Sequence, residues 1–462
     1  MLDSPSLRAN SVRYIGATAS AVGIQAPTAG VTFLPALMAA IVGEAGPLAF
    51  LLALLAMLLV SYAFIVLAAD SASAGSVFAF NGRALGYGYG FVSAWMLLAV
   101  YIAYSASIYA SNANFLNGLA VSGHVTIAWP LFAFVVWVLA LVLAYRRIAV
   151  STLLIFVLEG VAIVLVAIVA VAVLLKGGAV RRGLTLAPFT PSGVPIATIG
   201  LGVIFAFTGF SGFEVSATLG EEASRPRRVI PVSMIAALVV SGCIYVILSW
   251  VETIAYPSAA ALAGQPVPLV DIAGHYVAPA MGTLINVAAL ISGVGAELAA
   301  VNGANRLLFA LARDGFGPRW LSTVNRRHGS PSGALTVVGV LSILAVVPFM
   351  LNRTTPIDAF FYLATYGADL IIITYLLTSI AALVWSVRRG QIGVVRVAGL
   401  LAAIGVMAYI IKGTVYPIPQ APFDRCIYAA AATIAAGLAM LLVPTLRAKL
   451  ARSPLFAIAP AD

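Results

Sequence analysis

The sequence predicts an all-α membrane protein with twelve transmembrane helices. Three observations support this fold class: many apolar residues, few charges, and a series of long apolar segments. Of the 462 residues, 62% are hydrophobic and 9% are charged, whereas an average soluble domain has about 25% charged residues. The apolar segments reach the ~18 residues that are typical of a spanning helix. A transmembrane β-barrel is not expected, because its strands would alternate over about ten residues.

Glycines, prolines and charged clusters divide the chain into its predicted spans. No segment between the spans is long enough for a soluble domain, so residues 1–462 are expected to form a single transmembrane domain. The residues before the first span are polar, and we expect no cleavable signal peptide there. The twelve predicted spans are 14–40, 47–69, 87–118, 125–145, 148–175, 194–219, 229–253, 277–311, 334–351, 357–386, 394–411 and 424–446.

The basic residues are distributed unevenly between the two sides of this predicted membrane domain. With the first residue inside, 19 of the 25 Lys and Arg residues fall on the inner side and 6 on the outer side. Because cytoplasmic loops carry the excess of Lys and Arg, both termini are expected in the cytoplasm and the chain in the inner (plasma) membrane. The same bias accounts for the net charge of +10, so the expected partner is the lipid bilayer and not a nucleic acid.

Two predicted spans are interrupted at comparable positions. The first span contains the run Gly23–Gly30, which includes a proline, and the sixth contains the run Gly209–Gly212. Each is the first span of a block of five. Matched interruptions in the two halves of a membrane protein indicate the binding site of a secondary transporter. The backbone groups that a break exposes at membrane depth need a ligand or water.

These interruptions offer partners for both charged groups of an amino acid. The N–H groups of residues 28–30 begin a second half-helix and suit a carboxylate, and the carbonyls of residues 207–209 end a half-helix and suit an ammonium. An aromatic ring at Phe207 or Phe210 could close over the ligand or its cation, and the alternative is a ring that faces lipid or the core of the bundle. The alternative is that the glycines only allow close packing of helices. The candidate substrate-binding residues are Gln25, Ala26, Thr28, Ala29, Gly30, Phe207, Thr208, Gly209, Phe210 and Gly212.

Five acidic residues were assigned to the spans or their edges: Asp70, Glu159, Glu214, Glu297 and Asp369. An ionised carboxylate at the bilayer centre costs about 3 kcal/mol on insertion scales, so each needs a reason. Glu159 and Glu297 are the candidates for coupling transport to a proton, with a sodium ion as the alternative. The other interpretation of each is a structural carboxyl group bonded to a neighbouring helix. Asp369 has no explanation from the sequence.

Three stretches of the chain carry a family pattern: Phe205–Glu214 with Leu219–Glu222 and Arg225–Pro231, then Asn302–Gly315, and Ser73–Ser76 with Arg83–Gly86. In this order they resemble the sixth helix with the loop that follows, the eighth helix, and the stretch between the second and third helices of the amino acid–polyamine–organocation (APC) superfamily. The resemblance covers nearly the whole chain when the twelve spans are included.

The resemblance implies a five-plus-five inverted repeat with broken helices 1 and 6, followed by two C-terminal helices. The repeats would cover about 14–175 and 194–386, and the extra helices about 394–446. The spacing of Glu159 in its span resembles that of a lysine in some proton-coupled members, and Glu297 would face the same region. Many members carry Gly-x-Gly-Ile-Phe in helix 1, whereas this chain reads Gly-Ile-Gln-Ala-Pro at residues 23–27.

The sequence therefore predicts a permease that moves amino acids by proton-coupled transport. The alternatives are a transporter of amines, polyamines or organic cations, and an amino acid exchanger. An enzyme is not expected, because the chain contains neither His-Glu-x-x-His nor Gly-x-Ser-x-Gly. No cofactor or metal is expected, since Cys243 and Cys426 lie in apolar spans without metal-binding spacing.

Overall fold

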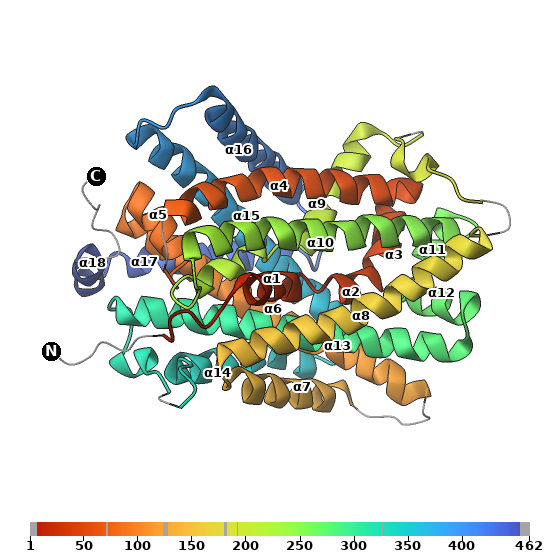
Figure 1. The fold of residues 1–462 in the computed structure, drawn as a ribbon, viewed down its shortest axis with the longest axis horizontal. Helices are drawn as coiled ribbons and strands as arrows, with labels where there is room; N and C mark the ends of the chain where they lie inside the picture. The colour runs from red at the N-terminus through yellow and green to blue at the C-terminus, as the bar shows by residue number, and fades with distance from the viewer. Residues whose placement is uncertain are drawn as a thin grey trace.

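The chain folds as a bundle of helices, most of which run roughly parallel to one another (Figure 1). Among the residues that this computed structural model describes, the only extended pairing is an isolated bridge between Val12 and Ala223. The all-α prediction is therefore confirmed for this part of the chain. The described residues are 7–70, 73–122, 128–179, 183–191, 193–325 and 327–452.

The helices follow the predicted spans closely along the chain. They are α1 (Tyr14–Gln25), α2 (Pro27–Val31), α3 (Leu34–Val42), η1 (Gly43–Ala45), α4 (Gly46–Asp70), α5 (Val77–Leu85), α6 (Tyr87–Ser122), α7 (Trp129–Ala144), α8 (Ile148–Lys176), η2 (Ala187–Phe189), α9 (Ile196–Phe210), η3 (Phe213–Leu219), α10 (Pro226–Ala255), α11 (Ala259–Ala263), α12 (Pro268–Tyr276), α13 (Pro279–Arg313), η4 (Arg319–Ser322), α14 (Ser332–Leu351), α15 (Pro356–Arg388), α16 (Val394–Val415), α17 (Asp424–Met440) and α18 (Pro444–Ala451).

Fewer than twelve of the described helices are, each by itself, long and apolar enough to cross a membrane. Within the described residues nine meet that standard, or ten if the pair Asp424–Met440 and Pro444–Leu450, bent by 83°, forms one span. The shortfall has a physical reason in each case. The first span is broken into short pieces, and α7 has only 16 residues. A multi-pass membrane protein is thus supported, while the number twelve stays a prediction.

Three helices lie where the sequence analysis placed loops. Helix α5 lies between α4 and α6, and α11 and α12 lie between α10 and α13. Helix α5 is almost wholly buried, and Asn81 on it donates hydrogen bonds to Ser93 and Thr378. Gly90 permits its close approach to α6, since a Cβ there would lie 2.6 Å from the carbonyl oxygen of Phe78.

The two broken helices lie at the centre of the bundle. Helix α1 contacts α8, α10, α13 and η3, and α1 and α2 appear in the middle of the view between α10 and α8 (Figure 1). Ala26 leaves α1 in the left-handed conformation with φ 41° and ψ 54°, and Pro27 begins α2. Gly212 has φ +99° after α9 ends at Phe210. The two predicted interruptions are therefore present in the fold.

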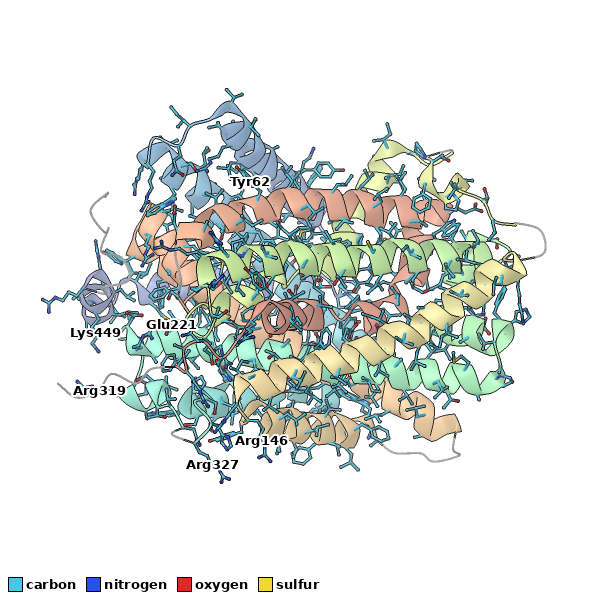
Figure 2. The ribbon with its side chains drawn as sticks, viewed as in Figure 1. Tyr62, Arg146, Glu221, Arg319, Arg327 and Lys449 are labelled. Carbon is cyan, nitrogen blue, oxygen red and sulfur yellow. The ribbon has the colours of Figure 1, made fainter. Side chains whose placement is uncertain are left out.

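Charged side chains gather toward one end of the bundle. Glu221, Arg319 and Lys449 lie near that end in Figure 2, where α5 and α18 also lie. The prediction for the termini falls on residues 1–6 and 453–462, which lie outside the described residues. Arg181, Arg182 and Arg326, which enter the charge count, also lie outside them.

Candidate functional site

The break in the first span exposes backbone donors at the start of α2. Pro27 has no N–H group and fixes the first helical φ angle, so the next two residues provide the first N–H groups. Thr28 donates both its N–H and its hydroxyl to Glu159 Oε1, at 3.3 Å and 2.9 Å. Ala29 N–H donates to Ser292 Oγ at 3.3 Å. Gly30 N–H bonds within the chain to Ala26 O at 2.8 Å.

Glu159 thus lies where the sequence analysis placed a substrate carboxylate. It projects from α8 and is 3% exposed, and its carboxylate accepts from the first free N–H group of α2. A carboxylate at this position is favoured by the partial positive charge of backbone N–H groups. Thr28, Ala29 and Glu159 therefore form one group of contacts, with Ser292 of α13 at its edge.

The break in the sixth span is held by tyrosines. Gly212 N–H donates to the Tyr375 hydroxyl at 3.0 Å, and that hydroxyl donates to Glu214. Tyr101 donates to the other oxygen of Glu214 at 3.0 Å. The carbonyl of Thr208 accepts from the Ser211 hydroxyl at 2.7 Å, so it is used within the turn. Glu214 therefore ties this break to two neighbouring helices, through Tyr101 of α6 and Tyr375 of α15.

The side chain of Gln25 joins the two breaks. Its Nε2 donates to Phe210 O at 2.8 Å, across 185 residues of sequence, and its Oε1 accepts from Ser241 Oγ at 2.6 Å. Both atoms of a buried amide are thus satisfied, as a low-dielectric interior requires. One residue at the end of α1 therefore satisfies the last carbonyl of α9.

Tyr245 of α10 fills the space between the breaks and was missed by the sequence analysis. Its hydroxyl donates to Gln25 O at 3.0 Å. A Cβ on Gly30 would lie 2.3 Å from that hydroxyl, and one on Gly209 would lie 3.2 Å from Tyr245 Cζ. The two glycines therefore make room for one ring. A tyrosine in an otherwise apolar span needs a buried partner for its O–H, which is the signal that identifies it.

Two aromatic residues of α9, Phe207 and Phe210, pack against tyrosines. Phe207 and Phe210 are both fully buried. The ring of Phe207 meets Tyr375 edge-on at 6.0 Å, and that of Phe210 meets Tyr245 edge-on at 5.4 Å. The hydroxyl of Thr208 donates back to Phe205 O at 2.7 Å. In this conformation both rings therefore belong to the wall of the site.

Glu297 belongs to a different cluster from Glu159. It is fully buried on α13 and accepts from Ser105 Oγ of α6 at 2.5 Å. The Ser105 Oγ also lies 3.1 Å from the Tyr109 hydroxyl, and Tyr109 pairs with Ser342 of α14 at 3.0 Å. Glu159 accepts from Thr28 of α2 and Glu297 from Ser105 of α6, so the structure does not bring the two predicted coupling residues into one set of contacts.

Three acidic residues inside the predicted spans were overlooked. Asp358 and Asp424 lie at the starts of 357–386 and 424–446, and Glu252 of α10 lies within 229–253 and is fully buried. Neither carboxylate oxygen of Glu252 has a hydrogen-bond partner among the described residues. The count of five acidic residues in or beside the spans was therefore too low.

Ion pairs and backbone bonds close one end of the space between the broken helices. Arg306 pairs with Glu222 at 2.5 Å, with both side chains almost completely buried. Arg313 donates two bonds to Glu221, at 2.8 Å and 2.7 Å. Burial opposes ionisation of Glu221, but the hydrogen bonds and charge of Arg313 outweigh it and hold the pKa of that carboxyl below its usual value.

The segment before α1 completes this closure. Val12 N–H donates to Glu222 O at 3.0 Å, and Ser224 N–H donates to Val12 O at 2.9 Å. The strand-like contact ties the start of the first broken helix to the loop after the second. Movement of either broken helix at this end therefore requires these bonds to break.

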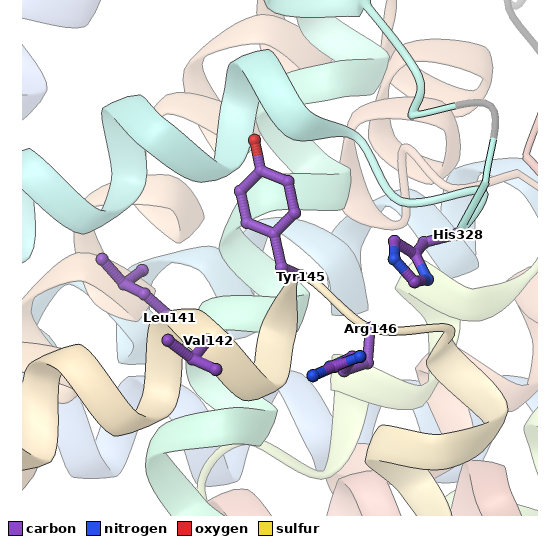
Figure 3. A pocket seen from close by; sticks show the side chains of 5 residues that line it. All are labelled: Leu141, Val142, Tyr145, Arg146 and His328. Carbon is purple, nitrogen blue, oxygen red and sulfur yellow. The ribbon is translucent and has the colours of Figure 1, made fainter.

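A surface cavity of about 320 Å³ lies away from the broken helices. Leu141 and Val142 of α7 line it together with Tyr145, Arg146 and His328 (Figure 3). None of these residues belongs to either break. Over the described part of the chain, no three His, Cys, Asp or Glu side chains are grouped to hold a metal ion.

Comparison with known proteins identifies a family. A family model described as amino acid permease matches residues 12–442. The chain is 29% identical over 369 residues to the branched-chain amino acid permease BcaP of Bacillus subtilis (strain 168), with 74% of each chain covered.

Two further relatives have other named substrates. The low-affinity putrescine importer PlaP of Escherichia coli (strain K12) is 27% identical over 320 residues, which cover 65% of this chain and 66% of that one. The aspartate-proton symporter of Bacillus subtilis (strain 168) is 31% identical over 170 residues, which cover 35% and 32%. All three relatives are named as transporters, but their named substrates differ.

Proposed function

The chain belongs to the amino acid permease family of the APC superfamily, and on that premise we propose that it moves amino acids across the cytoplasmic membrane by alternating access, coupled to protons. The observation that carries this proposal is the pair of broken helices joined through Gln25 and Tyr245. A ligand that replaced some of these bonds would bind both halves of the molecule at once. Its binding would therefore be linked to their relative movement.

We assign the substrate's charged groups to the two breaks. The N–H groups of Thr28 and Ala29 suit the carboxylate, and the carbonyls at residues 207–209 suit the ammonium. The ring of Tyr245 stands between the breaks, because Gly30 and Gly209 both face it. A shift of this ring would open space for the side chain of the substrate.

Glu159 supplies the proposed proton coupling. Its carboxylate already accepts from Thr28, so a substrate carboxylate at the same donors would bring two like charges together. Two carboxylates that share a site do not both stay ionised. Protonation of Glu159 would release Thr28 to the substrate, and loss of the proton would restore the original bonds. This exchange links proton movement to substrate movement.

Uptake into proteoliposomes tests this function. A thermal-shift panel of amino acids and amines first identifies the substrate, and uptake is then measured under an imposed pH gradient with and without sodium. Glu159→Gln is expected to lose gradient-driven accumulation while it retains exchange. Glu297→Gln is the matched control, because that carboxylate lies in a separate set of contacts. Full accumulation by Glu159→Gln would remove Glu159 from the proposal, and a strict sodium requirement would remove the proton.

The second candidate is transport of amines. The resemblance to a putrescine importer favours it, as do the buried carboxylates Glu159 and Glu214 at the two breaks. In this case ionised Glu159 would hold an ammonium group. A thermal shift with putrescine and none with leucine would select this candidate, and Glu159→Gln would then lose binding and exchange together.

The proposed membrane arrangement follows the charge bias. We propose twelve spans with both termini in the cytoplasm and an inverted repeat of five spans. The charged closure at Glu222 and Arg306 would then lie on the cytoplasmic side. Tags at residues 1 and 462 should resist protease added outside intact cells, and cleavage of either tag would show that the number of spans is different.

A further inference from the structure

Asp369 lines a cleft that has no part in the proposed substrate site. The cleft lies between α15, α16 and α17 and has a volume of about 110 Å³. Its other walls are apolar except for Thr414, with Ile372 and Ile373 from α15, Ile411 from α16 and Ile434 from α17. A carboxylate among isoleucines is costly unless something pairs with it.

The Asp369 carboxylate is buried and is not fully paired within the described part of the chain. The residue is 7% exposed, and its Oδ2 has no hydrogen-bond partner among the described residues. Among the described residues that line the cleft, Thr414 carries the only hydroxyl, and this already donates to Ile410 O at 2.9 Å. Ionised Asp369 and Thr414 therefore present only acceptor atoms to the cleft. A ligand that satisfies them must be a hydrogen-bond donor, and a positive charge suits the carboxylate best.

The shape of the cleft selects the remainder of the ligand. An apolar cavity of about 150 Å³ holds benzene, so this smaller cleft has room for about four non-hydrogen atoms. Val415 and Ala431 line it and are exposed on the outer surface of the bundle. A longer chain could therefore extend outward past these residues toward lipid.

We propose that this cleft binds a primary alkylammonium ion, with the ammonium on Asp369 and the alkyl chain between α16 and α17. The site is separate from the broken helices. Tyr375, six residues farther along α15, points to Gly212 and Glu214, so a different face of the same helix supports the sixth-span break. Occupancy of the cleft would hold α15 against α16 and α17.

The test uses n-propylammonium chloride with the full-length protein in lipid nanodiscs. Thermal unfolding is followed as the salt is titrated, with propan-1-ol as the neutral control and sodium chloride as the small-cation control. The wild type is expected to show a saturable rise in Tm with n-propylammonium alone. Asp369→Asn is expected to weaken binding by about 10- to 100-fold, which corresponds to one lost charge-assisted hydrogen bond.

Two further variants keep the test decisive if Asp369→Asn does not fold. Ala430→Leu fills the cleft and leaves the carboxylate in place, so it should also remove the rise in Tm. Asp358→Asn changes a carboxylate in the first turn of the same helix, which accepts a hydrogen bond from the Thr355 hydroxyl, and should leave the rise intact.

The outcomes that overturn the proposal are distinct. An equal rise with propan-1-ol would mean an apolar cavity only, and an equal rise with sodium chloride would mean a small-cation site. A response unchanged in both Asp369→Asn and Ala430→Leu would place the amine elsewhere. Loss of the response in Glu159→Gln, with Asp369→Asn unaffected, would place it at the broken helices.

Discussion

The two helix breaks are stabilised by different kinds of groups. In the first span a non-glycine residue, Ala26, adopts the left-handed conformation, and the freed N–H groups bond to Glu159 and Ser292. In the sixth span Gly212 adopts the left-handed conformation, and the N–H of Gly212 donates to the Tyr375 hydroxyl. The partners in the first break are small polar groups on two separate helices. Those in the second form an aromatic cluster around Glu214.

This difference suggests a division of roles. A carboxylate and a hydroxyl can be exchanged for groups of a ligand, because a substrate carboxylate offers the same acceptors. The tyrosine cluster has Phe64, Phe207 and Phe213 packed around Tyr375, and it has no such substitute. We therefore expect the first break to exchange bonds during transport and the second to keep its shape.

The largest effect is expected at Gly212, where the second break has least freedom. Gly212→Ala places a Cβ 2.6 Å from Ile24 Cγ2 at a φ of +99°, and strain and overpacking together cost about 3 kcal/mol. Uptake should fall by about 100-fold while membrane insertion persists. Gly295→Ala is the control, because its nearest neighbour would be 3.8 Å away. Equal uptake by the two variants would show that the second break needs no fixed shape.

The next largest effect tests the link between the breaks. Gln25→Leu leaves Phe210 O and the Ser241 hydroxyl without partners, and each unsatisfied group costs about 1–3 kcal/mol. Ser241→Ala removes one of these bonds and should cost about 1 kcal/mol. Uptake rates and unfolding temperatures of both variants measure the difference. If Gln25→Leu lowers the uptake rate and the unfolding temperature no more than Ser241→Ala does, the bond between α1 and α9 does not couple the breaks.

A smaller effect is expected at the exchangeable side of the first break. Thr28→Val removes one hydrogen bond to the Glu159 carboxylate, worth about 1.5 kcal/mol or tenfold in rate. It should also change the dependence of uptake on external pH. Thr32→Val is the matched control, since the Thr32 hydroxyl bonds only locally to Ala29 O. Identical pH profiles for the two variants would separate Thr28 from proton coupling.

The smallest effect concerns the ion pair that closes one end. Because the pKa of Glu221 is lowered in the folded protein from its ordinary value of 4.5, its stabilisation is present above pH 4.5. It is lost as the pH falls through the folded-state pKa. At neutral pH Glu221→Gln should destabilise by about 1 kcal/mol, and at a pH below the folded pKa the variant and wild type should unfold alike. A constant difference across this range would contradict the pairing with Arg313.

The sequence was sufficient to place the breaks but not to connect them. Proline and glycine mark a helix break locally, so the ends of α1 and α9 could be predicted. The bond from Gln25 to Phe210 joins residues 185 positions apart, and such a contact leaves no periodic signal. The same holds for Tyr245, whose role depends on two glycines in other helices.

Burial and span length were also only partly predictable. Glu252 carries no local mark that distinguishes it from a residue at a helix end, although it is fully buried. Helix α7 begins at Trp129, four residues into its predicted span, because Ala128 is extended and Pro130 favours the first turn of a helix. Asp369 was recognised as unexplained, and its cleft becomes visible only when α16 and α17 are in place.

Protection of a single cysteine tests most directly whether the first break contacts substrate. Ala29→Cys is introduced after Cys243→Ser and Cys426→Ser, and its reaction with a small maleimide is timed with and without the substrate found by thermal shift. Ala439→Cys is the remote control, because Ala439 is exposed on α17 and does not line the cleft of Asp369. Substrate should slow labelling at position 29 and leave position 439 unchanged. Unchanged labelling at position 29 under saturating substrate would contradict binding at the broken helices.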